Sequence, residues 1–163
     1  MLSLRRVNLL CLLGLVVILC TLTAQGYSRD EASMYQFALR LYEDGQYELA
    51  AKQLEQLMEQ YPSGRFMPDA VFLAGSAQEN LGKFKEASRF FQQYVTEFPD
   101  GARLCEAMVL LGTDQQRMGH YADAEGTFKR VVEQKRCDKQ FEEATAKLAE
   151  LFFVQGRFGD AIA

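Results

Sequence analysis

The stretch Gly45-Gln46-Tyr47-Glu48-Leu49-Ala50 returns three more times along this chain, at a constant interval of 37 residues. Every copy has a glycine, an aromatic residue two positions later and an alanine five positions later. A fixed period of roughly 20 to 50 residues indicates a repeat architecture, in which each unit stacks on its neighbours. The repeat-defining residues are Gly45, Tyr47, Ala50, Gly82, Phe84, Ala87, Gly119, Tyr121, Ala124, Gly156, Phe158 and Ala161.

Each of these glycines lies between two stretches whose apolar residues recur every three or four positions, which is the period of an α-helix. Glycine accepts a positive φ at a helix C-terminus without a Cβ clash, so it suits the turn between two helices. The aromatic residue can pack across that turn, and the small alanine lets the two helices approach closely. The sequence therefore predicts a series of helical hairpins.

The ends of the hairpins carry their own signals. Pro62 and Pro99 each follow an aromatic residue at the end of a second helix. Proline stops a helix there because it lacks the backbone N–H that continuation needs. The third hairpin has Lys135-Arg136-Cys137-Asp138 at the corresponding place, and we expect a weaker stop there.

At these positions the chain resembles a tetratricopeptide repeat array. That family has small residues at positions 8 and 20 of each unit, a bulky apolar residue at 24 and proline at 32. The chain departs from the pattern at Gln78 and Gln115, where the family has a bulky residue, and at Arg136, which replaces the third proline. The matching residues are Ala38, Gly75, Gly112 and Ala149 at position 8, Ala50, Ala87, Ala124 and Ala161 at position 20, Leu54, Phe91 and Phe128 at position 24, and Pro62 and Pro99 at position 32.

The resemblance implies an all-α fold, a right-handed α-solenoid of stacked helical hairpins. The repeat array would occupy residues 27–163, with units 31–67, 68–104, 105–141 and an incomplete 142–163. The last unit ends soon after its glycine turn, so we expect a fragment of a longer repeat protein. The units resemble those of bacterial cell-envelope members of the family, of the outer-membrane assembly lipoprotein and Tol-Pal-associated type.

Residues 1–26 differ from the rest of the chain. Arg5 and Arg6 precede an apolar run, and no charged residue follows until Arg29. A basic start, an apolar segment and a small-residue exit indicate a secretory signal peptide. The uncharged span from Val7 to Ser28 is also long enough to be an uncleaved membrane anchor. Lipid attachment at Cys20 is a third option.

All three options place the repeats outside the cytoplasmic membrane, because the two arginines remain inside. We therefore expect the periplasm or cell envelope, with an inner-membrane anchor as the alternative. The chain has a net charge of −4. An acidic chain without a basic stripe argues against binding to nucleic acid or to anionic lipid. Membrane contact would therefore involve the N-terminal segment alone, and only if that segment is not cleaved.

The sequence offers no candidate for catalysis, for a metal or for a cofactor. His120 is the sole histidine, whereas a zinc site needs about four ligands. No nucleophile motif or phosphate loop is present. Cys105 and Cys137 lie at neighbouring ends of the third hairpin, so a disulfide is one interpretation in an oxidising compartment and two unrelated small residues is the other.

In tetratricopeptide arrays, the first helix of each unit lines a concave groove, so the resemblance implies a binding surface here. Large aromatic side chains in such a groove suit a peptide or a helix of a protein partner. Some of them could instead pack against the neighbouring unit. The groove residues would be Tyr35, Leu39, Tyr42, Phe72, Ser76, Glu79, Asn80, Val109, Thr113, Gln116, Arg117, Glu150 and Phe153.

We therefore expect a non-catalytic scaffold for protein–protein interaction in the cell envelope. Two alternatives are an accessory repeat region of a longer envelope enzyme, for instance one acting on peptidoglycan, and a self-assembly module that associates through the uncovered fourth unit.

Overall fold

The computed structural model of the chain describes residues 30–161. Its helices lie in one unit that begins at Glu31, and no strand occurs among the described residues. A short 3-10 helix, η1 (Lys135–Cys137), separates the last two α-helices. The α-helices are α2 (Glu31–Glu43), α3 (Tyr47–Gln60), α4 (Met67–Asn80), α5 (Phe84–Glu97), α6 (Leu104–Arg117), α7 (Tyr121–Glu133) and α8 (Asp138–Val154).

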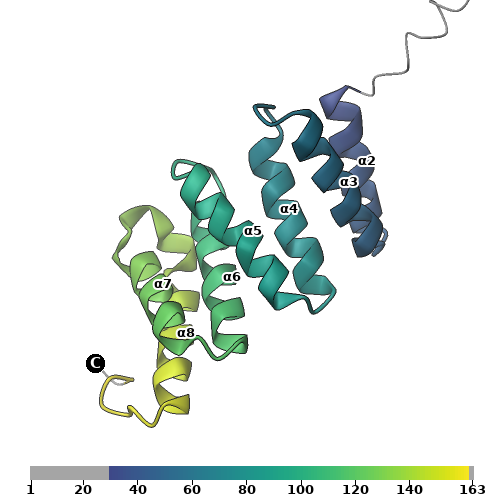
Figure 1. Cartoon of the computed structure of the whole chain (residues 1–163). Helices are drawn as coiled ribbons and strands as arrows, with labels where there is room; N and C mark the ends of the chain where they lie inside the picture. The colour runs from purple at the N-terminus through teal and green to yellow at the C-terminus, as the bar shows by residue number, and fades with distance from the viewer. Residues whose placement is uncertain (1–29, 162–163) are drawn as a thin grey trace, which may run out of the picture. The chain divides into compact units, whose positions relative to one another are not determined.

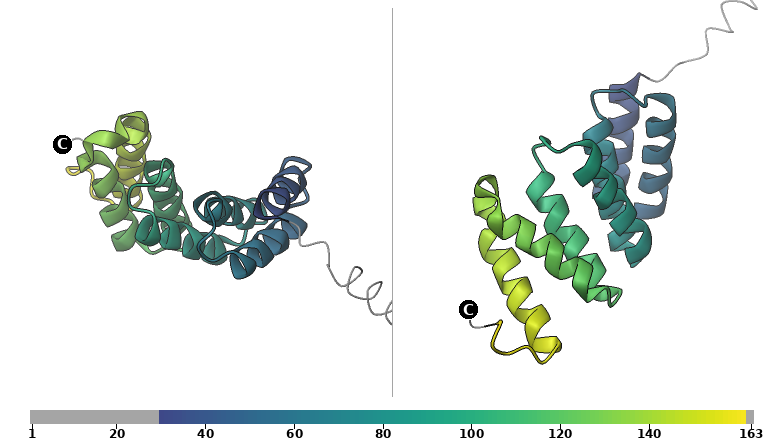
Figure 2. Two further views of the ribbon diagram at one scale, coloured as in Figure 1. Left: turned by 90° about the horizontal axis from the view of Figure 1, so that it is seen from above. Right: turned by 60° about the vertical axis from the view of Figure 1, so that its left-hand side comes forward.

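Each helix packs on the next one along the chain, and the hairpins α2–α3, α4–α5 and α6–α7 follow one another in a row (Figure 1). Seen from above, this helical unit is a curved row (Figure 2). The prediction of an all-α solenoid of stacked helical hairpins is confirmed. The first helices of units 1 to 4 are α2, α4, α6 and α8, and the second helices of units 1 to 3 are α3, α5 and α7.

The repeated glycines form the turns of the hairpins. Gly45, Gly82, Gly119 and Gly156 all have φ between 71° and 79°, and no other described residue has a positive φ. At the first turn, Gly45 N donates to the carbonyl of Tyr42 and Gln46 N donates to that of Leu41. These paired bonds satisfy the last carbonyls of the first helix, as in a Schellman motif. A side chain at these glycines would be strained by the backbone alone.

Within each middle hairpin, a glycine on the first helix faces an aromatic ring on the second. A Cβ built on Gly75 would lie 2.8 Å from Cε1 of Phe91, and one on Gly112 would lie 2.6 Å from Cε1 of Phe128. Both phenylalanines are completely buried. Close packing of a ring against bare backbone fixes the distance between the two helices.

The ends of the three hairpins are joined by different chemistry. In unit 1, Glu31 Oε1 accepts a hydrogen bond from Phe66 N at 2.7 Å. In unit 2, the hydroxyl of Tyr94 accepts from Arg103 N at 3.2 Å. In unit 3, a disulfide joins Cys105 to Cys137, with the Cα atoms 5.5 Å apart.

The weaker stop expected after α7 takes the form of η1 rather than an extended linker. Arg136, which stands where the other units have proline, donates to the carbonyl of Pro99. Its guanidinium also lies 3.5 Å from the carboxylate of Asp100. The third unit is thus attached to the linker that precedes it by a side chain rather than ended by a proline.

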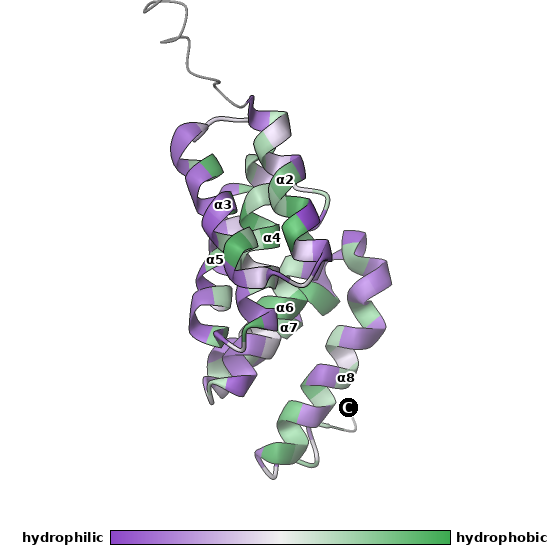
Figure 3. Ribbon diagram, turned by 90° about the vertical axis from the view of Figure 1, so that its right-hand side faces the viewer, coloured by the Kyte–Doolittle hydropathy of each residue, from purple (hydrophilic) through white to green (hydrophobic). Residues whose placement is uncertain are grey.

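Beyond α8 the chain makes a turn that includes Phe158 and Ala161, not a second helix. Hydrophobic residues stand near the end of α8 (Figure 3). Phe153, Val154 and Phe158 are 67%, 57% and 56% exposed, whereas Phe152 is buried. Phe153 and Phe158 contact each other edge to face.

The predicted N-terminal signal peptide or anchor, with its Cys20 and the span from Val7 to Ser28, falls outside the described residues. Among residues 30–161, no helix has the length and apolar character that a membrane crossing requires.

Candidate protein-binding surface

The first helices of the four units carry most of the predicted groove residues on accessible surface. Ten of the predicted residues are partly or fully exposed. They supply aromatic rings, amides and both signs of charge, and no single residue type dominates. These residues are Tyr35, Leu39, Tyr42, Glu79, Asn80, Thr113, Gln116, Arg117, Glu150 and Phe153.

Three predicted groove residues are buried, so the structure does not place them on the accessible surface. Phe72 is 1% exposed and Val109 is 2% exposed, and both belong to the hydrophobic core. The ring of Phe72 contacts Phe91 and Tyr94 edge to face. Ser76 is 8% exposed and its hydroxyl donates to the carbonyl of Phe72.

The residue that covers Phe72 was missed at the sequence level. Arg103 lies just before α6, and its guanidinium stands 3.4 Å from the centre of the Phe72 ring. The same guanidinium makes two hydrogen bonds of 2.9 Å to Glu106. What the surface presents at this point is therefore an arginine–glutamate pair. The sequence did offer a signal for the ion pair, since Arg103 and Glu106 are opposite charges three residues apart at the start of a helix.

Tyr35 lies near the start of α2 and forms the aromatic part of the surface in unit 1. Its ring stacks on Phe66, with ring centres 4.9 Å apart and planes 14° from parallel. Partial burial raises the pKa of the Tyr35 hydroxyl, and the carboxylates of Asp69 and Glu43 add to that effect against the opposing charge of Arg103. The hydroxyl therefore stays a hydrogen-bond donor at neutral pH.

Tyr42 joins unit 1 to unit 2. Its hydroxyl accepts a hydrogen bond of 3.1 Å from Asn80 Nδ2, and its ring meets Tyr47 edge to face. Asn80 Nδ2 also donates to the carbonyl of Ser76 at 2.8 Å. Both side chains are held in fixed positions, which lowers the entropy that a bound partner would otherwise remove.

At the equivalent place between units 2 and 3, an ion pair replaces the tyrosine–asparagine contact. Arg117 lies 2.7 Å from Glu79 and stacks over the ring of Phe84 at 4.7 Å. Arg117 also lies 3.4 Å from Asp114. One arginine thus serves two carboxylates and an aromatic ring.

Asp114 was not recognised as unusual from the sequence. Its side chain is fully buried, in the place that Ala77 and Leu151 take in the neighbouring units. Burial raises the pKa of Asp114 to about 7, and the charge of Glu79 adds to the rise, while Arg117 opposes it. Its Oδ2 has no hydrogen-bond partner among the described residues.

A small pocket of about 260 Å³ lies where α6 and α8 adjoin. Thr113, Gln116 and Arg117 line it from α6, and Lys147 and Glu150 line it from α8. The lining offers hydrogen-bond donors and acceptors suited to a peptide backbone.

The residues that could take part in metal binding or catalysis do not come together in one site among the described residues. Among residues 30–161 no group of three or more metal-ligating side chains comes together. His120 lies on the second-helix side of the third unit, away from the predicted groove residues.

Comparison with known proteins supports the repeat interpretation. The profile of the family described as tetratricopeptide repeat matches residues 35–102 and 109–163. Among curated proteins, none matches the chain.

Solved structures of MamA share the fold. MamA 41-end from Desulfovibrio magneticus RS-1 is 18% identical, with a TM-score of 0.70 over 85% of this chain and 73% of that one. A MamA RS-1 double mutant is also 18% identical, with a TM-score of 0.70 over 97% of this chain and 86% of that one. MamA AMB-1 is 14% identical, with a TM-score of 0.67 over 82% of this chain and 73% of that one.

Proposed function

The chain belongs to the tetratricopeptide repeat family, and from that premise we propose that it is a non-catalytic scaffold that binds a peptide or helix of a partner protein. The binding surface is the groove formed by α2, α4, α6 and α8. Stacked repeats create extended surfaces of this kind, on which each unit contributes a few side chains.

The observation that carries this proposal is the row of restrained, accessible side chains along the first helices. Tyr35 and Tyr42 are fixed by ring contacts, and Arg117 is fixed by its ion pair with Glu79. Rigid aromatic and arginine side chains are the residue types that contribute most to binding at protein interfaces. Amide and hydroxyl groups between them can pair with the partner's backbone.

We also propose that the protein works in the cell envelope, outside the cytoplasm. The basic start and apolar run of the first 26 residues support export by a signal peptide, with an uncleaved inner-membrane anchor as the alternative. The disulfide between Cys105 and Cys137 supports the same location, since disulfides persist in oxidising compartments. A fusion of residues 1–40 to alkaline phosphatase tests it, because that reporter is active only after export.

Site-specific photocrosslinking in cells tests the groove. A photoreactive residue at Thr113, on α6, is expected to give a discrete crosslink to one partner. The matched position is Lys52, which is exposed on α3, a second helix, and should give none. Adding Tyr35→Ala with Tyr42→Ala should abolish the crosslink at Thr113 while circular dichroism remains helical. Crosslinks from Lys52 alone would move the binding site to the second helices.

Self-association is a second candidate function, favoured by the exposed apolar side chains of Phe153, Val154 and Phe158. Sedimentation of the full chain over a concentration series tests it. If self-association uses this patch, Phe153→Ser with Phe158→Ser will give a monomer at concentrations where the unaltered chain is dimeric. If Phe153→Ser with Phe158→Ser removes the crosslink at Thr113 but leaves the sedimentation unchanged, the groove binds a protein other than a second copy of this chain.

A further inference from the structure

A polar side-chain contact joins the first helices of neighbouring units, and between units 1 and 2 this contact is neutral. The amide of Asn80 donates to the hydroxyl of Tyr42 at 3.1 Å. Tyr42 is at position 12 of its unit and Asn80 at position 13 of the next. Neither an amide nor a tyrosine hydroxyl changes its charge near neutral pH, so this contact is expected to be insensitive to pH.

Between units 2 and 3, the same two repeat positions hold Glu79 and Arg117, and the contact is charged. Arg117 Nη1 lies 2.7 Å from Glu79 Oε1. The same nitrogen lies 3.4 Å from Oδ1 of Asp114. A single guanidinium nitrogen therefore faces two carboxyl groups, one in the adjoining unit and one on its own helix.

The two carboxyl groups differ in their exposure to water. The side chain of Glu79 is 20% exposed, whereas that of Asp114 is fully buried. The Oδ2 atom of Asp114 has no hydrogen-bond partner among the described residues. A carboxyl group removed from water without full hydrogen bonding favours its neutral form, and the pKa of Asp114 is accordingly raised to about 7. While Asp114 keeps its proton, Glu79 is the carboxylate that pairs with Arg117.

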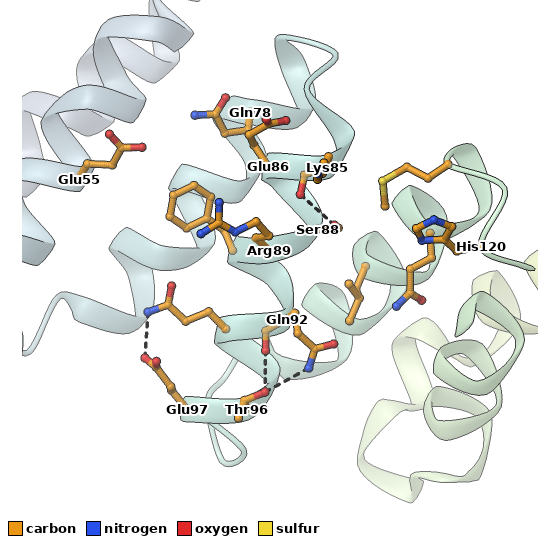
Figure 4. A pocket seen from close by; sticks show the side chains of 15 residues that line it. Glu55, Gln78, Lys85, Glu86, Ser88, Arg89, Gln92, Thr96, Glu97 and His120 are labelled. Atoms are coloured by element: carbon orange, nitrogen blue, oxygen red, sulfur yellow. Dashed lines mark hydrogen bonds between the residues drawn. The ribbon is translucent and has the colours of Figure 1, made fainter. Parts of the chain in front are cut away.

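Few other charges reach this contact. Among residues 30–161, Glu79 of α4 and Arg117 of α6 are the charged groups that act on Asp114. From α5, the ring of Phe84 lies 4.7 Å from the guanidinium carbon of Arg117. The charged side chains of α5 line a separate pocket, with His120, on the second-helix side (Figure 4). Helix α5 therefore adds no charge to this seam.

On the side of α7 and α8, Arg117 lines the small pocket of about 260 Å³. Lys147 and Glu150 of α8 line it too, and they lie 3.2 Å from each other. Helix α7 contributes Tyr121. Because the two charges of α8 pair with each other, Arg117 is the cation available to both carboxyl groups within the described part of the chain.

We propose that Glu79, Arg117 and Asp114 form a pH-sensitive contact between units 2 and 3. While Asp114 is protonated, Arg117 pairs with Glu79 and links α4 to α6. When Asp114 releases its proton to the solvent, the buried carboxylate needs a cation, because an unpaired buried charge is strongly destabilising. The guanidinium moves toward Asp114, its pairing with Glu79 lengthens, and the two units are linked less tightly on this side.

The change alters the charge that the first helices present. The three side chains together carry no net charge while Asp114 is protonated and one negative charge after it ionises. The affinity of the groove for a charged partner segment would then change across neutral pH. That consequence alone rests on the proposed function, whereas the pH-sensitive contact is a property of the folded chain and is tested without a partner.

NMR of the full chain provides the test. The carboxyl carbon signals of labelled aspartate are followed from about pH 5 to pH 9, and the Asp114 signal is the one that Asp114→Asn lacks. We expect it to titrate near pH 7. The side-chain protons of Arg117 report where the guanidinium lies, because the nearby ring of Phe84 shifts their signals. We expect these signals to move with the same midpoint as the Asp114 signal.

Asp114→Asn keeps the shape of the side chain but cannot ionise, so it should abolish the movement of the Arg117 signals. If that variant does not fold, Asp114→Leu replaces it, since Leu151 stands at the same position of unit 4. Asp123→Asn is the matched control: Asp123 is exposed on α7, and the step near pH 7 should persist. An Asp114 that is ionised over the whole range, or that titrates while the Arg117 signals stay fixed, would overturn the proposal. So would an Arg117 step that survives in Asp114→Asn.

Discussion

The second hairpin, α4–α5, and the third, α6–α7, share their backbone and differ in their polar chemistry. Both have a positive-φ glycine at the turn and a phenylalanine ring packed on a helical glycine. The second is closed by a tyrosine hydroxyl, whereas the third is closed by a disulfide and contains a buried aspartate. The glycine and aromatic positions thus specify a hairpin, and from the positions between them we expect the third unit to respond to redox and pH and the second not to.

The largest expected difference concerns the disulfide. Cys105→Ala with Cys137→Ala removes a crosslink that spans 32 residues. The chain-entropy argument gives a loss of about 3 to 4 kcal/mol in the free energy of unfolding. Urea unfolding followed by circular dichroism measures it. Hydrogen exchange should rise in α6 and α7 and stay low in α4 and α5.

Dithiothreitol provides the control for this prediction. It should lower the stability of the unaltered chain by the same amount and leave the double variant unchanged. A chain that dithiothreitol does not destabilise would show that the third hairpin is held by packing alone.

The ring-on-glycine contacts should respond alike in the two hairpins. Gly75→Val and Gly112→Val each place new atoms within 3 Å of a buried ring. Such overpacking is expected to cost about 2 to 3 kcal/mol at either site, measured as a fall in the urea midpoint. A much smaller loss at one site would show that its hairpin can open without disrupting its neighbours.

Gly126 offers the matched control on α7. A Cβ there meets nothing within 4 Å, and the residue lies in the interior of a helix. Gly126→Ala should therefore raise the free energy of unfolding by about 0.5 to 1 kcal/mol through helix propensity. A loss of stability at Gly112 and a gain at Gly126 would distinguish steric overlap with the neighbouring ring from the helix propensity of the backbone.

The buried aspartate should give the third hairpin a pH dependence that the second lacks, since the equivalent residue is Ala77. The pKa of Asp114 is about 7 in the folded chain, against an ordinary value of 3.8. Between about pH 4 and 7 the folded state holds a proton that the unfolded state releases, so this contribution to stability is lost as pH rises. Asp114→Asn cannot ionise and should remove the loss.

The measurement compares the free energy of unfolding of Asp114→Asn with that of the unaltered chain at pH 4.5 and at pH 8. The difference between the two chains isolates Asp114, because all other titrating groups are common to both. Each pKa unit corresponds to about 1.4 kcal/mol, so the variant should gain roughly 2 kcal/mol or more on the unaltered chain between these pH values. If the difference between the chains is the same at both pH values, Asp114 is already ionised at pH 4.5.

The sequence was sufficient to predict the hairpins, because turn glycines and close ring contacts depend on residues near one another in each unit. The exposure of the predicted groove residues could be read from the sequence only in part. Position 5 of the unit is partly exposed at Tyr35 but buried at Phe72 and Val109. At Phe72, an arginine from the following linker covers the ring. Contacts between neighbouring units depend on the angle at which the units pack, and the repeat pattern within one unit does not determine that angle.

The smallest expected effect has opposite signs in the two hairpins. Gln78 and Gln115 occupy the same repeat position, where the family usually has a bulky apolar residue. Gln115 Oε1 accepts a hydrogen bond of 2.9 Å from Thr127. In unit 2 the residue that matches Thr127 is Phe90, which has no hydroxyl to donate, and the side-chain oxygen of Gln78 is buried without a partner among the described residues. Gln78→Leu should therefore raise the free energy of unfolding by about 1 kcal/mol, and Gln115→Leu should lower it by a similar amount by leaving the Thr127 hydroxyl unpaired. Thermal unfolding of both variants measures these changes. Gln115→Leu combined with Thr127→Val is the control, because it removes the unpaired hydroxyl as well. If the lost hydrogen bond is responsible, Thr127→Val restores most of the stability that Gln115→Leu removes.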